Sequence, residues 1–133
     1  MTEAVERSVA EADVERWLSA KRVRASKRKD AEDQIEALIE AVVWGQMIVN
    51  EDDQLVQTLD FPIEAEIRTT NLTYKNRVSV SEMNSKLKGV KSGDVDDRVL
   101  RVISAITGKP AGVIGRLDTS DYSVAQSVAI FFL

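Results

Sequence analysis

The scarcity of helix-breaking residues in the first 50 positions is the feature that constrains the fold of this chain most. This stretch contains no proline, and its single glycine is Gly45. Alanine, glutamate, lysine and arginine, which all favour helix, dominate its composition. We therefore predict an N-terminal helical arm over residues 1–50, formed either by one long helix or by two helices broken near residues 26–30.

The second half of this arm is predicted to be an amphipathic helix over residues 30–49. Asp30 is its predicted N-cap, and Asp33 lies in the first turn, where a negative charge favours the helix dipole. Apolar residues recur at three- and four-residue steps and share one face. They are Ile35, Leu38, Ile39, Val42, Val43 and Met47. This stripe can form core, join copies of the chain, or offer a groove to a partner's helix, and we predict its first five members as partner-binding residues.

The pattern changes after residue 51, where apolar residues begin to alternate with polar ones. Leu55, Leu59, Phe61 and their neighbours follow two-residue spacing, and β-branched residues continue to Val80. This pattern predicts a two-stranded β-hairpin with strands over residues 54–61 and 65–75 and a turn near Pro62. Two strands alone are marginally stable, so we expect them to pack on helices.

Helical patterns return after Ser79, and three to four short helices are predicted. The first opens at Ser81 and Glu82 and ends near Gly89. The second begins after Asp94 and stops at Gly108, with Pro110 just beyond. A helical turn over residues 111–116 and a final helix follow, the latter capped by one of Asp118, Thr119 and Ser120.

These elements predict an α+β fold that is mainly helical. The arm is followed by the hairpin and then by the cluster of short helices. The predicted domain boundary near residue 51 separates residues 1–50 from a β-then-α unit over residues 51–133.

The composition argues against catalysis, because the chain contains neither cysteine nor histidine. Disulfides, thiolate chemistry, the commonest metal ligand and the commonest neutral-pH general base are therefore missing. Asp94, Asp96 and Asp97 lack the glycine and glutamate of a calcium loop, and we predict that they, like Asp118 and Asp121, cap helices. We expect a protein that is not an enzyme and that binds no cofactor or metal.

A basic run over residues 21–29 holds six of the 18 basic residues. It is either a patch for nucleic acid or an acidic partner, or a solvated surface balanced by the acidic residues before it. No aromatic residue interleaves the run, and the net charge of the chain is −4, so we do not expect nucleic-acid binding.

The chain ends in four consecutive apolar residues, Ile130 to Leu133. One helix face cannot cover all four, so they either fold back into the core or meet a partner. We predict Phe131, Phe132 and Leu133 as partner-binding residues.

All apolar runs are far shorter than the ~20 residues of a membrane span, and no targeting signal is visible, so we expect a cytoplasmic protein without a membrane partner.

A series of short motifs runs through residues 55–133. They are Leu59, Pro62 and Ile63; Leu72, Thr73, Tyr74 and Lys75; Glu82; Ile103-Ser104-Ala105-Ile106-Thr107-Gly108; Leu117-Asp118-Thr119-Ser120-Asp121; and Phe131 with Phe132. In the order of these motifs, this part of the chain resembles the phage tail assembly chaperones of contractile-tailed phages. The family's usual glycine between the strands is missing from residues 64–70, and the resemblance does not extend to residues 1–50.

The resemblance implies a small non-enzymatic chaperone that acts in the host cytoplasm. Such proteins bind the tape measure protein, keep it soluble, and aid its incorporation while tail tube subunits polymerise around it. Many are absent from the finished virion. Tape measure protein is therefore the expected partner, with tail tube subunits and a homo-oligomer as further possible partners. The alternative is a structural tail or baseplate accessory protein of the virion.

Overall fold

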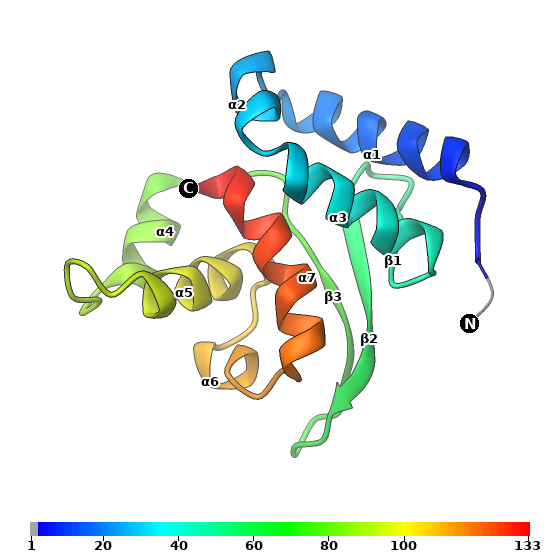
Figure 1. The fold of residues 1–133 in the computed structure, drawn as a ribbon. Helices are drawn as coiled ribbons and strands as arrows, with labels where there is room; N and C mark the ends of the chain where they lie inside the picture. Colours follow the sequence, from blue (N-terminus) through cyan, green and yellow to red (C-terminus); the bar gives the residue numbers. More distant parts are fainter. Residues whose placement is uncertain (1–2) are drawn as a thin grey trace.

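The computed structural model describes residues 3–133 and shows the predicted α+β, mainly helical fold (Figure 1). Helices α3 and α7 lie over one face of a three-stranded antiparallel sheet, α1 lies along α3, and α4 to α6 stand beside α7. The elements are α1 (Arg7–Lys21), α2 (Ala25–Asp30), α3 (Glu32–Val43), β1 (Met47–Val49), β2 (Leu55–Ile63), β3 (Thr69–Thr73), α4 (Val80–Leu87), α5 (Val95–Thr107), α6 (Ala111–Ile114), α7 (Thr119–Ala129) and a closing 3-10 turn (Ile130–Phe132).

The predicted helical arm forms three helices rather than one or two. The first break is at Arg22, whose φ of 61° turns the chain out of α1. The second is at Ala31, between α2 and α3. Asp30 is not the N-cap that the sequence predicted, because it is the last residue of α2. Ala31 takes the N-cap position with a buried side chain, and no side chain caps α3.

The amphipathic helix predicted over residues 30–49 ends at Val43. Gly45 adopts a φ of 77°, which glycine reaches without steric cost, and the chain then enters strand β1. Met47 is buried, but it belongs to a strand rather than to the predicted helix, and it pairs there with Gln57 of β2. The predicted hairpin is present as β2 and β3, and β1 adds a third strand in the order β1-β2-β3.

Strand β2 runs through the position where a turn was predicted. Pro62 lies inside β2, and the connection to β3 is formed by residues 64–68. The register shifts between the pairs Thr58–Asn71 and Ile63–Thr69, so β2 carries extra residues there. Such a bulge accommodates a proline because the residues in it do not all donate to the neighbouring strand.

The carboxylate of Asp121 completes this bulge from the facing helix. The backbone N–H groups of Asp60 and Phe61 donate to its two oxygens, each at 3.0 Å. Asp121 is only 2% exposed and thus ties α7 to β2. Its predicted role as a helix cap is wrong, whereas Asp118 does cap α7 by accepting from the N–H of Ser120.

The caps predicted for α4 and α5 are close to those observed. Ser79, two residues before the predicted start of α4, accepts from the N–H of Glu82, which matches a capping box. Asp94 accepts from the N–H of Asp97, and Gly108 ends α5 with a φ of 71°. The sequence therefore placed the limits of α5 correctly.

Helix α1 packs into the same hydrophobic core as residues from the second half of the chain. Trp17 is fully buried, and its indole N–H donates to the side chain of Asn76 at 3.0 Å. Arg16 pairs with Asp53 at 2.9 Å and donates to the carbonyl of Val49. Residues on both sides of the predicted boundary near residue 51 thus contribute to one hydrophobic cluster.

Candidate partner-binding surfaces

The apolar stripe of α3 lies inside the molecule. Leu38 is fully buried, Ile35 is half-buried, and the exposed fractions of the other predicted partner-binding residues are 8% or less. They are Ile39, Val42 and Val43. The stripe is covered because α3 packs between α1 and α7. Of the three alternatives left open by the sequence, this packing favours core, and it leaves little of the stripe for a partner.

The apolar C-terminus also folds back onto the molecule. Phe131 is 8% exposed and meets the ring of Trp17 edge-on, with the ring centroids 5.3 Å apart. The Nζ atom of Lys21 sits 3.5 Å from the centroid of the Phe132 ring. Of the three predicted residues, Leu133 is the one that is clearly exposed, at 52%.

Two hollows lie along the boundary between α5 and α7. The first has a volume of about 340 Å³ and is lined mainly by apolar side chains of α5, α6, α7 and the α6–α7 loop. These are Leu100, Ile114, Leu117 and Tyr122. The second, of about 350 Å³, lies towards the other end of α7 and is lined by Val99, Ile130, Leu133 and polar side chains of α3 and α7.

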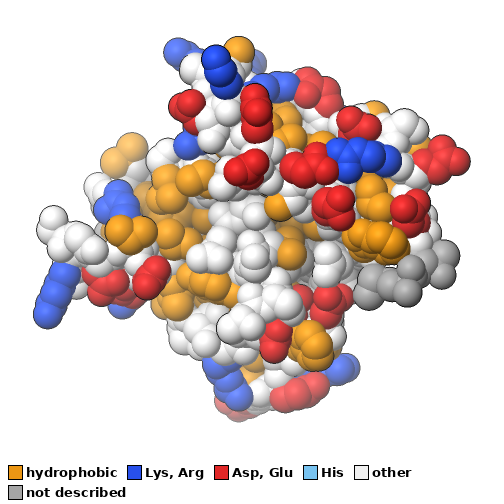
Figure 2. Space-filling model, viewed as in Figure 1, with side chains coloured by type: hydrophobic (Ala, Val, Ile, Leu, Met, Phe, Trp, Pro, Cys, Tyr) orange, Lys and Arg blue, Asp and Glu red, His pale blue; other side chains and the backbone are white. Residues whose placement is uncertain are grey.

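We call the two hollows together the α5–α7 groove. Val99 and Leu100 are adjacent on α5, and Tyr122 and Ser123 are adjacent on α7, so the two hollows lie close together although they share no lining residue. Figure 2 shows hydrophobic side chains gathered on this side of the molecule, over α5 and beside α7. The groove offers a surface on which an apolar partner segment can lie.

One end of the α5–α7 groove is acidic. Asp96 and Asp97 line the first hollow. Asp97 pairs with Arg101 at 3.3 Å, whereas no ion pair among residues 3–133 involves Asp96. Burial and the nearby charge of Asp96 raise the pKa of the Tyr122 hydroxyl. This end of the groove therefore suits a partner that carries a basic residue beside its apolar ones.

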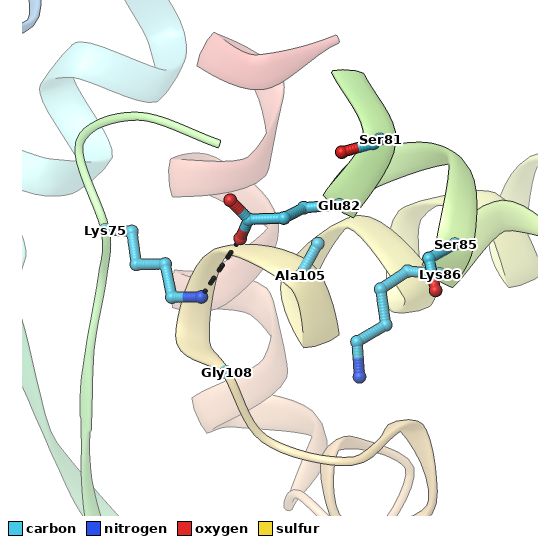
Figure 3. Close-up of a pocket in the computed structure, with 7 residues that line it drawn as sticks. All are labelled: Lys75, Ser81, Glu82, Ser85, Lys86, Ala105 and Gly108. Atoms are coloured by element: carbon cyan, nitrogen blue, oxygen red, sulfur yellow. Dashed lines mark hydrogen bonds and ion pairs between the residues drawn. The ribbon is translucent and has the colours of Figure 1, made fainter. Parts of the chain in front are cut away.

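A third hollow, between α4 and the end of α5, is polar. Figure 3 shows Lys75 from the loop before α4 pointing towards Glu82 on α4, and their side chains pair at 3.4 Å. Hydrogen bonds from Ser79 and Lys75 lower the pKa of the Glu82 carboxyl. The hollow has a volume of about 440 Å³, and its charged groups are partly paired, so it is a less suitable site for an apolar segment.

The basic run over residues 21–29 does not form one continuous surface. Lys21 is 9% exposed and donates to the backbone carbonyl of Asn76 at 3.0 Å. Arg28 pairs with Glu15 on α1 at 2.6 Å, as expected for a surface balanced by the preceding acidic residues. Burial, and then the charge of Arg77, lower the pKa of Lys21 to about 8.

Buried polar groups in the described chain form a closed network. The hydroxyl of Tyr74 donates to the side-chain oxygen of Gln57 at 2.6 Å, and the Gln57 amide donates to the backbone carbonyl of Asp121. Burial strongly raises the pKa of Tyr74. Within residues 3–133, every buried side-chain nitrogen and oxygen has a partner, and no cluster of three or more acidic residues is placed to hold a metal.

None of the helices in this part of the chain is long and apolar enough to span a bilayer.

The sequence carries a signal for the walls of the α5–α7 groove but not for the groove itself. Val99 and Tyr122 occur at helical spacing with the other apolar residues of α5 and α7. Leu100 lies one position off the α5 stripe, so its role depends on where α6 and the following loop pack. Only Leu133 belongs both to the predicted partner-binding residues and to the groove.

Comparisons with known proteins identify no relative of this chain: no family model, curated protein or solved structure matches it.

Proposed function

We propose that this protein is a non-enzymatic phage tail assembly chaperone. It binds the tape measure protein in the host cytoplasm, keeps it soluble, and is absent from the mature virion. Support comes from the resemblance of residues 55–133 to that family. The observation that carries the proposal is the half-open α5–α7 groove, whose first hollow is lined mainly by apolar side chains.

The groove has the properties that such a chaperone needs. A tape measure protein is a long helix with apolar stripes, and an amphipathic helix binds by laying its apolar face into a groove. Each hollow is open to solvent on one side, which favours an affinity low enough for the chaperone to leave when tube subunits arrive. Several copies along one client hold it together without a single tight site. The net charge of −4 keeps the coated client soluble.

Coexpression with the tape measure protein of the same genome tests this proposal. We expect the wild-type protein to retain the client in the soluble fraction and to copurify with it. Leu133→Glu and Tyr122→Glu each place a charge in the groove and should abolish copurification. Val80→Glu is the matched control, because it adds the same charge at a side chain that is 77% exposed on α4 and outside the groove.

The outcome is informative only for folded variants, so circular dichroism accompanies each measurement. Folded groove variants that retain the client as well as the wild type contradict the proposed binding surface. A wild-type protein that leaves the client insoluble contradicts the chaperone function itself.

The alternative is a structural tail or baseplate accessory protein. Two large apolar side chains on the hairpin favour it, because Phe61 is 58% and Ile67 is 80% exposed. Such side chains can be buried in an assembly. Mass spectrometry of purified particles separates the two functions: a stoichiometric amount of this protein supports the structural component, and its absence supports the chaperone.

A further inference from the structure

A hollow of about 270 Å³ at the corner between α1 and α2 gathers basic side chains from three segments. We call it the basic hollow. Its cations come from the end of α1, the α1–α2 turn with α2, and the loop between β3 and α4. They are Lys21, Arg22, Arg24, Lys27 and Arg77. Lys and Arg side chains stand out over α2 in Figure 2.

The charged side chains that line the basic hollow are all positive. No acidic side chain is among the residues that form it. None of the ion pairs within residues 3–133 involves any of its five cations, although Arg28 nearby is paired with Glu15. The lowered pKa of Lys21, caused by burial and then by the charge of Arg77, is a second sign of like charges held together. An anion placed among them gains from several cations at once.

The rest of the lining is Ser26 and three apolar residues, Val23, Phe131 and Leu133. Val23 is half-buried, Phe131 is mostly buried, and Leu133 is 52% exposed. Inorganic phosphate has no apolar group that could pack against these side chains, whereas a peptide can pack an apolar side chain against them. The combination of cations and apolar side chains is typical of a surface that binds a peptide.

We propose that the basic hollow docks a short acidic segment of a partner polypeptide. Two or more carboxylates of this segment face Arg24, Lys27 and Arg77, and an apolar side chain next to them packs against Val23 and Leu133. The partner is thus defined by its chemistry, as a segment in which aspartate or glutamate alternates with leucine-like residues.

The surroundings of the basic hollow disfavour nucleic acid. Asp30, Glu32 and Asp33 are exposed at the end of α2 and the start of α3. A long polyanion that extends from the hollow along α2 therefore meets negative charge. No aromatic face is open for a base, because Phe131 is buried against Trp17 and Lys21 covers Phe132. A short acidic segment avoids both obstacles.

The basic hollow adjoins the α5–α7 groove, since Leu133 lines both. A partner segment that leaves the groove at this end therefore meets the cations, while the other end of the groove is acidic at Asp96 and Asp97. This link to the groove rests on the proposed function and gives the client segment a polarity, with basic residues at one end and acidic residues at the other. Binding of an acidic segment in the basic hollow does not depend on the tape measure protein being the partner. It can therefore be tested without that protein.

Fluorescence anisotropy tests the inference with the full-length protein and a short labelled peptide that alternates glutamate with leucine. We expect saturable binding at physiological ionic strength. The same peptide with glutamine in place of glutamate should not bind. The double variant Arg24→Gln with Lys27→Gln should weaken binding about tenfold, as expected when two charge pairs are lost. The control, Lys88→Gln with Lys91→Gln, removes the same charge from exposed positions near α4 and α5 and should bind like the wild type.

Each other result overturns the inference. Equal losses in the two double variants mean a non-specific charge effect. Binding of the glutamine peptide means that the cations do not select the ligand. A labelled DNA duplex that binds more tightly than the peptide, or pyrophosphate that binds while the peptide does not, assigns the hollow to phosphate groups. Failure of client copurification with retained peptide binding contradicts the proposed function and leaves this inference standing.

Discussion

Two apolar helix surfaces of this protein differ in how far neighbouring helices cover them. The stripe of α3 is closed on both sides, because α1 and α7 pack against it, and Leu38 at its centre is fully buried. The boundary between α5 and α7 stays open at Leu100 and Tyr122, which are half-buried. The residues of the α3 stripe show helical periodicity in the sequence, whereas Leu100 lies one position off the periodic apolar residues of α5. The difference teaches that periodicity predicts an apolar face, while neighbouring elements decide whether it becomes core or surface.

The largest effect is expected from opening the closed face. Leu38→Ala should destabilise the protein by about 3–5 kcal/mol, because it leaves a cavity in a fully packed site. Leu100→Ala should cost only about 1 kcal/mol, because that side chain is already partly in solvent. Urea unfolding followed by circular dichroism measures both. Equal costs would contradict the distinction between a closed and an open face.

The next effect concerns the contact that holds one wall of the groove on the sheet. Asp121→Ala leaves the partly buried N–H groups of Asp60 and Phe61 without their acceptor and should cost about 2–4 kcal/mol. Asp118→Ala removes an exposed helix cap and should cost about 1 kcal/mol. Denaturant midpoints of the two variants give the comparison. A larger loss for Asp118→Ala would show that the Asp121 contact is not the main anchor of α7.

A smaller effect should appear in the pH dependence of the free energy of unfolding, through Lys21 at the end of α1. The pKa of Lys21 is lowered from 10.5 to about 8, so between these values the unfolded chain binds more protons than the folded one. Stability should therefore rise with pH across this window, by about 2 kcal/mol. Lys21→Met lacks the titrating group and should not show this component. Parallel stability profiles of the two proteins from neutral pH to about pH 10 would contradict a buried ammonium at this site.

No effect is expected from metals or nucleotides at either face. Neither face gathers three or more metal-ligating side chains within residues 3–133. Zinc, magnesium, calcium or ATP should leave the melting temperature unchanged in a thermal shift assay. A saturable rise of several degrees with any of them would reveal a binding site that neither face explains.

The elements with strong local signals could be predicted from the sequence. Asp94 and Gly108 mark the limits of α5 because a carboxylate cap and a left-handed glycine each act within one turn. Strand β1 was missed because Met47 fits the helical spacing of α3 as well as the pattern of a strand. Pairing with Gln57, ten residues later, decides between them, and no local pattern carries that information.

The candidate site was less predictable for the same reason. Asp121 follows Asp118 closely and resembles a second helix cap, yet its oxygens are used by a bulge in β2. The basic hollow combines Lys21 with Arg77, which are distant in the sequence and meet only after folding. Phe131 and Phe132 are apolar as a partner surface would be, but Trp17 and Lys21 cover them.

Site-specific photocrosslinking in the client complex tests the central claim most directly. A photoreactive residue at Gln126, on the wall of the α5–α7 groove, should crosslink to the tape measure protein. The same residue at Thr58, exposed on the opposite face of the sheet, should not. Crosslinks from Thr58 with none from Gln126 would place the client on the sheet and contradict the account.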